Sequence, residues 1–209
     1  SAEKGFGYLS FSEFTLGLDE TVETKAVAAS GNYTITIIDS EGNEVEKKTY
    51  DEVKNNDYKL TLTAGSYTLV ASSSADEVPL AAFEQPVYGV SKEFTIAAGM
   101  TTSIGELVCT LQQCKVTVSY SDDFLKMVTG QCSTKVTVDP EQPLEYALNA
   151  DKTYEQSAGY FAVTGSTMTV VFKGDIEGGS KSMTKVFSNI APKQWRQIKF
   201  IPKVDEEGN

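Results

Sequence analysis

The sequence contains no histidine, and its one arginine is Arg196. Without histidine there can be no Ser-His or Cys-His nucleophile pair, and both the usual general base near neutral pH and the commonest zinc ligand are missing. One arginine cannot form the cluster of guanidinium groups that binds carboxylates or phosphates in a bidentate fashion. These two absences remove the commonest hydrolytic, zinc-dependent and phosphate-recognising machineries.

Cysteine is also scarce, and no apolar run is long enough to span a bilayer. Cys109, Cys114 and Cys132 are odd in number and lack the spacing of a zinc site. We interpret all three as free, buried thiols. If the strands that hold Cys114 and Cys132 pair antiparallel, Cys114 lies opposite the neighbourhood of Val138, too far from Cys132 for a disulfide. The sequence opens at Ser1 with no signal peptide, which we do not take as evidence for a cytoplasmic protein.

Negative charge predominates, since the sequence has 29 acidic and 18 basic residues and a formal net charge of -11. An acidic surface repels phosphate backbones and anionic lipids, so we expect no nucleic-acid partner. The same charge is common among soluble extracellular proteins.

Short alternating segments rich in Thr, Val, Ile, Tyr and Phe dominate the chain, and Gly, Asn, Asp, Ser and Pro separate them. This pattern is typical of strands joined by turns in a sandwich or barrel. The 209 residues suffice for one large β domain or two small sandwiches. We therefore predict an all-β fold.

In the first half, we expect one long strand from Phe6 to Leu18 with a bulge near Ser12-Glu13. A turn is predicted over 39–43, followed by a strand over 45–50. Residues 61–68 and 95–102 resemble each other position by position, and each suggests a hairpin with an Ala-Gly turn. Pro79 and Pro86 exclude the segment between them from a central strand.

Near residues 107–115 the chain is expected to pass into a second unit, which gives two tandem β-sandwich domains, 1–110 and 111–209. A short helix over 121–128 should begin at the cap Ser121 and end at Gly130. A flexible hairpin tip is predicted over 175–180 and a solvated tail over 205–209. Further strands are predicted over 136–138, 144–148, 160–163, 168–172, 183–187 and 196–201.

Candidate chemical sites are few. Residues 39–42, Asp-Ser-Glu-Gly, suggest a calcium loop only faintly, because an EF-hand needs more oxygen ligands and a closing glutamate. Glycoside hydrolysis would need two acids about 5 to 10 Å apart across a cleft. Glu84 and Asp123 can be named, but no spacing in the sequence brings them together. We therefore predict no catalytic residues, no metal site and no cofactor.

Aromatic residues beside predicted loops offer a different possibility. Exposed tyrosine and tryptophan can stack on sugars or anchor a protein partner. The candidate partner-binding residues are Tyr88, Tyr154, Tyr160 and Trp195, which would have to line one exposed strip. Alternatively, these aromatics cap the ends of the core, where most aromatic area in such a domain must be buried.

Several segments in order resemble a known family. They are residues 7–11, 24–26, 33–37 with Gly42, 62–69, 83–89, 94–99 and the strand after Cys114. Over most of the first 120 residues the chain resembles an uncharacterised domain-of-unknown-function family of Bacteroidetes surface lipoproteins. That family is similar to the fimbrillins and Mfa-type fimbrial proteins, which contain two tandem β-sandwich domains.

The resemblance implies an exported, non-enzymatic protein at the outer cell surface, held at the outer membrane by an N-terminal lipid anchor that is not in this sequence. The leading hypothesis is an adhesin-like or fimbria-associated structural role with a protein or glycan partner. A surface glycan-binding module is the alternative, and a glycoside hydrolase is a third. Fimbrillin-like proteins polymerise by strand exchange after a cut that follows an arginine. Since Arg196 is far from the first strand, we expect the purified protein to be a monomer.

Overall fold

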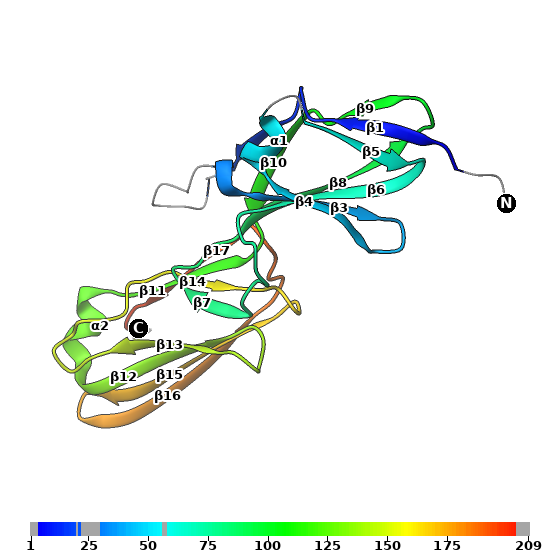
Figure 1. Cartoon of the computed structure of the whole chain (residues 1–209). Coiled ribbons are helices and arrows are strands. Elements are labelled where there is room, and N and C mark those ends of the chain that lie inside the picture. The colour runs from blue at the N-terminus through cyan, green and yellow to red at the C-terminus, as the bar shows by residue number, and fades with distance from the viewer. Residues whose placement is uncertain (1–3, 20, 22–29, 56–57, 204–209) are drawn as a thin grey trace, which may run out of the picture. The chain divides into compact units, whose positions relative to one another are not determined.

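The computed structural model describes residues 4–19, 21, 30–55 and 58–203 (Figure 1). Contacts between Cα atoms divide the chain into two compact units. Unit 1 contains residues 1–78 and 87–112, and unit 2 contains residues 79–86 and 113–209. Both are built almost entirely of strands, as the alternating sequence predicts. The segment 24–26 of the resemblance and the predicted tail 205–209 lie outside the described residues.

Unit 1 contains two sheets. The smaller has the strand order β5-β1-β9 and the larger has the order β2-β10-β8-β6-β3-β4. Their elements are β1 (Phe6–Ser10), β2 (Thr15–Leu18), β3 (Thr34–Asp39), β4 (Glu44–Thr49), β5 (Lys59–Thr63), β6 (Gly65–Ser72), β8 (Tyr88–Ile96), β9 (Thr101–Ser103) and β10 (Glu106–Leu111), with a short 3-10 turn over Ser30–Asn32 and helix α1 (Tyr50–Lys54).

The predicted single first strand is wrong. The chain leaves the small sheet after β1, turns at Ser12-Glu13 and enters the large sheet as β2. Phe11 and Phe14 at this corner are 1% and 0% exposed, and their rings meet edge to face at 5.9 Å. Burial of both rings explains why the apolar parity changes here, where we expected a bulge.

The two Ala-Gly segments are sheet-switching corners, so the hairpin prediction is also wrong. Before Gly65 the chain lies in the small sheet as β5, and after it in the large sheet as β6. At Gly99, whose φ is +73°, it passes back from β8 to β9. The two similar segments, 61–68 and 95–102, are therefore the places where the chain crosses between the same pair of sheets. A hairpin and a corner need the same turn residues, which explains the error.

Unit 2 is a sandwich of two four-stranded sheets with the orders β17-β11-β14-β7 and β13-β12-β15-β16. Its elements are β7 (Ala81–Phe83), β11 (Cys114–Tyr120), α2 (Asp122–Met127), β12 (Val128–Thr137), β13 (Leu144–Leu148), β14 (Gly159–Phe161), β15 (Met168–Ile176), β16 (Gly179–Phe187) and β17 (Trp195–Phe200). All six further strands predicted for this half are present.

Strand β7 shows that the unit boundary is not a single point in the sequence. Residues 79–86, expected in the first domain, pair with β14 as an edge strand of unit 2. Pro79 and Pro86 flank this strand, in keeping with the edge position expected from proline. The two-domain division near residue 110 therefore has to be changed by assigning residues 79–86 to the second domain. The independent stability of the two units stays a prediction.

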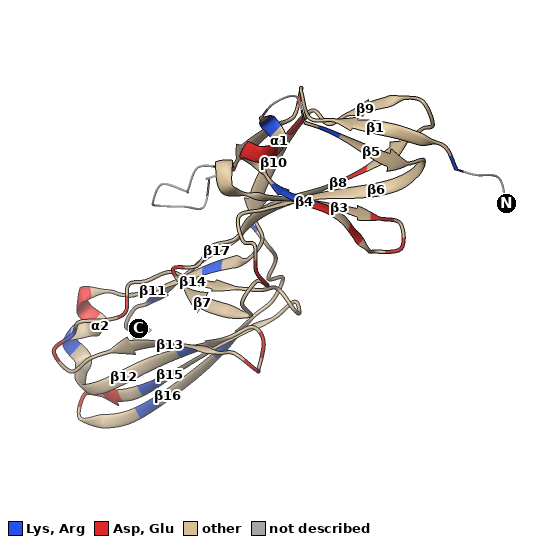
Figure 2. Ribbon diagram, in the orientation of Figure 1, with Lys and Arg blue, Asp and Glu red and all other residues tan. Residues whose placement is uncertain are grey.

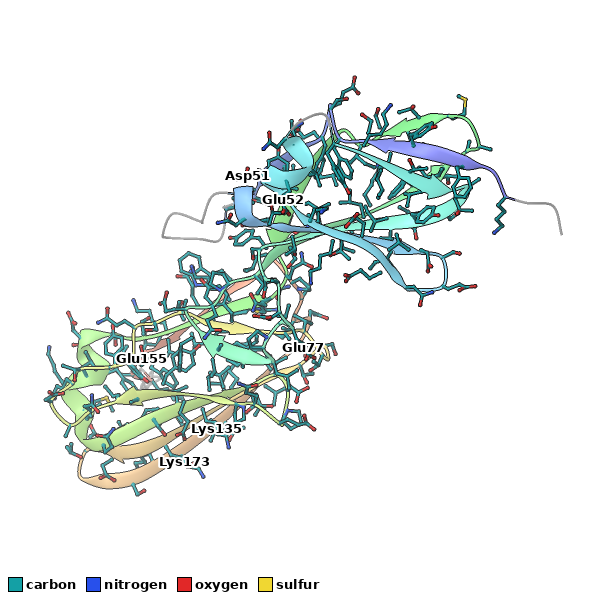
Figure 3. The ribbon with its side chains drawn as sticks, viewed as in Figure 1. Asp51, Glu52, Glu77, Lys135, Glu155 and Lys173 are labelled. Atoms are coloured by element: carbon teal, nitrogen blue, oxygen red, sulfur yellow. The ribbon has the colours of Figure 1, made fainter. Side chains whose placement is uncertain are left out.

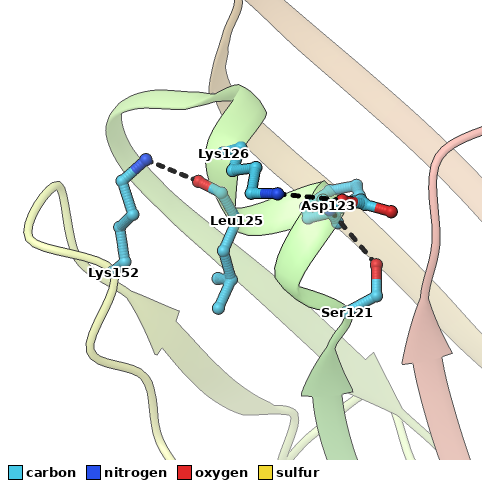
Figure 4. A network of polar contacts seen from close by, with 6 residues as sticks. Ser121, Asp123, Leu125, Lys126 and Lys152 are labelled. Atoms are coloured by element: carbon cyan, nitrogen blue, oxygen red, sulfur yellow. Dashed lines mark hydrogen bonds and ion pairs between the residues drawn. The ribbon is translucent and has the colours of Figure 1, made fainter.

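Helix α2 links the two sheets of unit 2 (Figure 4). Ser121 Oγ accepts a hydrogen bond from the backbone N–H of Phe124, which confirms the predicted cap. The predicted end at Gly130 is wrong, because the chain becomes extended at Val128 and Gly130 lies within β12. Since β11 and β12 belong to different sheets, the expected pairing of the Cys114 and Cys132 strands does not occur.

The core of unit 2 contains two hydroxyl contacts between its sheets. Tyr146 on β13 is fully buried, and its hydroxyl donates to the carbonyl of Val116 on β11 at 2.9 Å. Tyr120 on β11 shares a hydrogen bond of 2.9 Å with Thr134 on β12, and burial raises the pKa of Tyr120 to about 12. Satisfied polar contacts of this kind fix how two apolar layers face each other.

All three cysteines are free and buried. Burial raises the pKa of both Cys109 and Cys114 to about 11, which keeps them as unreactive thiols at neutral pH. We expect the folded protein at pH 8 to react slowly with an aromatic disulfide reagent. After denaturation without reductant, three thiols should react per chain. Rapid native labelling, or a count of one after denaturation, would contradict this expectation.

Candidate functional site

An open groove lies along one edge of the unit 2 sandwich, between β15 and β16 of one sheet and β17 of the other. It encloses about 560 Å³, and we call it the β16–β17 groove. Its lining is Val170, Phe172, Met183, Thr184, Lys185, Phe187, Gln197, Ile198, Lys199, Phe200 and Ile201. This lining contains no carboxylate, thiol or imidazole, so it offers binding surface and no acid–base pair.

The floor of the groove is aromatic. Phe172 is fully buried, and its ring centroid lies 5.3 Å from that of Phe200. Met183 on β16 remains 47% exposed, and Ile201 just after β17 is 66% exposed. The groove thus presents apolar side chains to solvent at the place where the two sheets diverge.

Strand β16 is the edge of its sheet. It pairs with β15 over its whole length, and within the described residues no strand pairs with its other side. Register places Lys185 opposite Val170 and Met183 opposite Phe172, so these two side chains point toward the sandwich interior. Lys181 follows the same parity. Lysines that point inward on an edge strand discourage a neutral strand from pairing there.

The outer face of the same sheet carries charges of both signs. Lys135 and Lys173, labelled in Figure 3, are exposed on β12 and β15, but Glu145 on β13 lies opposite Lys135 and Asp175 follows Lys173 on β15; Figure 2 shows blue and red segments in this sheet. With Lys181 and Lys185 of β16 included, the four strands have a small positive balance in a chain of net charge -11. It would favour an acidic partner over a basic one.

The four aromatic residues singled out from the sequence do not form an exposed strip. Tyr88 on β8 of unit 1 is 1% exposed, and Tyr160 on β14 of unit 2 is 2% exposed. Neither ring is available for stacking on a sugar. Tyr88 and Tyr160 are therefore core residues, as in the alternative interpretation.

Trp195 and Tyr160 lie in the same sheet, on the two strands that flank β11. Register places Lys115 opposite Trp195 on one side and opposite Tyr160 on the other. The Lys115 ammonium lies 4.6 Å from the centroid of the Trp195 ring, and the indole N–H donates to Thr117 Oγ1 at 2.9 Å. Because Lys115 is buried, this cation–π contact holds one face of the Trp195 ring inside the protein.

Tyr154 packs edge to face on Tyr120, with ring centroids 5.0 Å apart. It belongs to the partly buried shell around the unit 2 core. Its place therefore agrees with a structural role.

The two acids considered for hydrolysis serve local structure. Glu84 Oε1 accepts a hydrogen bond from the backbone N–H of Ala158 at 3.0 Å. Asp123 is 77% exposed and pairs with Lys126 within α2 at 3.2 Å (Figure 4). Nearby, Lys152 Nζ donates to the carbonyl of Leu125 at 2.7 Å. Each interaction holds a turn or a helix end in place.

The segment that suggested a calcium loop is a hairpin turn. The Asp39 carboxylate accepts hydrogen bonds from the backbone N–H groups of Asn43 and Glu41, which lowers its pKa. Gly42 has a φ of +86°, as predicted for this turn. In the part of the chain that the structure describes, no three histidine, cysteine or acidic residues are grouped to hold a metal ion.

Sequence reasoning missed two surfaces. The lining of the β16–β17 groove depends on which strands form edges, and that is a property of the sheet order. Phe6, Tyr8 and Met100 are 62%, 41% and 61% exposed in unit 1. The available signal was the alternation of Phe6 and Tyr8 with Gly7 and Leu9, which places both rings on one face.

Comparison with known proteins gives the family. Residues 5–209 match the model of a domain of unknown function, DUF4493, and the chain belongs to that family. The sequence-based assignment to a domain-of-unknown-function family is confirmed at this level. No curated protein matches the chain. None of the helices in the described ranges has the length and apolarity needed to cross a membrane.

Solved structures are similar to the chain at low identity, and the first of those described here shares its fold. A candidate polysaccharide-binding protein (DUF1812) of Bacteroides thetaiotaomicron has 9% identity and a TM-score of 0.53, and the match covers 93% of this chain and 91% of that one. A candidate cell adhesion protein of Bacteroides fragilis has 12% identity and a TM-score of 0.42, with coverage of 99% and 93%. A fimbrial assembly protein of Parabacteroides distasonis has 11% identity and a TM-score of 0.43, with coverage of 93% and 89%.

Proposed function

We propose that this chain is a non-catalytic, lipid-anchored protein of the bacterial cell surface with an adhesin-like or fimbria-associated structural role. In this proposal the β16–β17 groove receives an extended segment of another protein. The observation that carries the proposal is the combination of an unpaired edge strand with an apolar floor beside it, within the residues that the structure describes. An incoming strand would gain hydrogen bonds from the β16 backbone and burial on Phe172 and Phe200.

The charges near the groove define the partner. Lys185 lies among the lining residues, and its ammonium is 5.1 Å from the centroid of the Phe187 ring. Lys199 lines the groove from β17. A segment that alternates apolar and acidic residues would place its apolar side chains on the floor and its carboxylates near these ammonium groups. A second copy docking an uncharged strand would bring no counter-charge to either lysine, which supports a monomer in the purified state.

We expect the purified protein to bind a synthetic ten-residue peptide of alternating valine and glutamate. It should bind the valine–lysine counterpart at least about tenfold more weakly, because like charges would meet at Lys185 and Lys199. Met183→Asp should weaken binding of the acidic peptide by about tenfold, since it places a carboxylate over the apolar floor. Isothermal titration calorimetry measures both effects.

Val186→Asp is the matched control, since Val186 is on the same strand, 56% exposed and of the opposite parity. It should leave the affinity within about twofold of the wild type, because it does not line the groove. Equal affinity for acidic and basic peptides, or binding that Met183→Asp leaves unchanged, would contradict the proposal.

A further inference from the structure

A second surface, on unit 1, carries exposed aromatic side chains that the proposed function does not use. The side chains of Phe6 and Tyr8 leave β1 on the face that does not meet the core, since Gly7 and Leu9 between them are buried. Met100, on the corner before β9, is 61% exposed, and its carbonyl accepts a hydrogen bond from the N–H of Tyr8 at 2.9 Å. We call the side chains of Phe6 and Tyr8 and their neighbours on the outer side of the small sheet the β1 face.

Hydroxyl groups flank the rings on both sides. Register places Thr63 opposite Phe6 and Thr61 opposite Tyr8 on β5, and Thr101 opposite Tyr8 on β9. Thr61 and Thr101 are exposed. Because side chains opposite each other in a sheet point to the same side, the threonine hydroxyls stand beside the aromatic rings. The surface therefore alternates ring faces with short hydrogen-bonding groups.

The geometry points to a neutral polysaccharide chain as the occupant of the β1 face. A sugar ring has a face of C–H groups that packs on an aromatic ring and a rim of hydroxyls that bond to groups such as the threonines. Residues two apart on one strand are about 6.6 Å apart, so both rings can lie beneath successive parts of one extended chain.

The charge and the area of the β1 face favour a neutral glycan over an anionic polymer or a second copy of the chain. Among the described residues, the one charged side chain that register and contacts place on this face is that of Lys59, whose ammonium is 5.3 Å from the centroid of the Tyr8 ring. One cation in a chain of net charge -11 gives little attraction for an anionic polymer. The exposed parts of the two rings amount to roughly 200 Å², whereas a stable protein interface takes about 800 Å² from each partner. The patch thus matches a short stretch of glycan better than a second copy.

Lys59 has a defined place in the proposal. Its ammonium lies over the Tyr8 ring at the end of a flexible stem, so it must move off the ring when a sugar stacks there, and it can then donate to a sugar hydroxyl. Lys59→Met keeps the apolar stem and removes the donor. This variant therefore separates the contribution of the stacked rings from that of the charge.

Affinity gel electrophoresis with the full chain tests the proposal, with mannan, xylan, β-glucan, galactan and amylose as neutral probes and polygalacturonate and chondroitin sulfate as anionic ones. We expect at least one neutral polysaccharide to retard the wild type. Tyr8→Ala and Phe6→Ala should each weaken that binding about tenfold, and the double variant should abolish it. Lys59→Met should weaken it by about threefold or less.

Val45→Ala is the matched control, because Val45 is an exposed apolar residue on a strand of the other sheet of unit 1. It should leave retardation unchanged. Since Phe6 and Tyr8 are exposed, both variants should retain the wild-type circular dichroism and melting temperature. Variants of the β16–β17 groove should bind these sugars normally, so the two proposals can fail independently.

Three outcomes would overturn the inference. They are no retardation by any neutral polysaccharide, retardation that survives the double variant, and binding confined to the anionic polymers. Light scattering provides a further check. If the wild type is a dimer and the double variant is a monomer, the β1 face mediates self-association, and this result would also overturn the glycan proposal.

Discussion

Tyr146→Ala is expected to lower the free energy of unfolding of the chain by about 3–5 kcal/mol. The side chain is fully buried, packs edge to face on Phe83 at 4.9 Å, and crosses the core of unit 2 to reach the carbonyl of Val116. Its removal leaves a cavity and takes the tyrosine hydrogen bond from the Val116 carbonyl at the same place. A domain is stable by only about 5–15 kcal/mol, so this loss is a large fraction of the stability of a domain.

Denaturant titration followed by circular dichroism gives the free energy, and two further variants separate its parts. Tyr146→Phe removes only the hydroxyl and should cost about 1–3 kcal/mol. Gly159→Ala would place a methyl group against the Tyr146 hydroxyl, since an added Cβ would overlap that oxygen. We expect Gly159→Ala to be less damaging when it is combined with Tyr146→Phe than in the wild type. Additive effects of the two substitutions would show that the hydroxyl does not fill the space above Gly159.

Gly174→Val is the second substitution with a large expected effect, a loss of about 3 kcal/mol or more. Between Val128 and Cys132 the register of β12 against β15 shifts, and Gly174 lies opposite Cys132. A Cβ on Gly174 would overlap Cys132 Sγ and would lie 2.6 Å from the Cys132 Cα. A mutation could remove the sulfur, but the Cα is part of the backbone, so β12 itself would have to move to relieve this overlap.

A second substitution at Cys132 should restore only part of the stability that Gly174→Val removes. Cys132→Ala combined with Gly174→Val should recover a minor part of the lost stability, because the contact with the Cα remains. Gly165→Ala is the control, since Gly165 has no neighbour within 4 Å of an added Cβ. It should change stability by about 0.5 kcal/mol at most. Full recovery in the double variant would mean that the sulfur alone excludes a side chain at position 174.

The alternating pattern was enough to predict most strands, because a residue's parity in a half-buried strand follows directly from its chemistry. It could not predict the sheet to which each strand belongs. The corners at Phe11–Phe14, Gly65 and Gly99 use the residues of ordinary turns, so nothing local separates them from hairpins.

Helix α1 was missed although its signal was available. Thr49 and Glu52 form a reciprocal capping box, in which Thr49 Oγ1 accepts from the Glu52 N–H and Glu52 Oε2 accepts from the Thr49 N–H. Figure 3 labels Glu52 beside Asp51 on this helix. We extended the preceding strand to residue 50 because Val45 and Tyr50 are typical of strands. A five-residue helix has too little periodicity to correct such an assignment.

The candidate sites show where sequence reasoning ends. Tyr88 and Tyr160 stand near predicted loops, but burial depends on which neighbouring strands cover them, and both prove to be core residues. Phe6 and Tyr8 have the same alternation as buried residues elsewhere, and only the sheet order shows that nothing in the described residues covers them. The proposed binding surfaces are therefore defined by the edges and outer faces of sheets.

The parallel pairing in unit 1 has a consequence for the order of events during synthesis. Strand β1 pairs with β9 through Tyr8 and Thr101, and β2 pairs with β10 through Thr15 and Glu106. Neither pair can form until residues 101 and 106 have emerged, and contacts between such distant residues slow folding to milliseconds or seconds. Strand β7 must wait longer still, since its partner β14 begins at Gly159. Until residues 101 and 106 have emerged, β1 can pair with β5 but not with β9, and β2 has no partner among the described strands, so β2 is among the last strands of unit 1 to be protected.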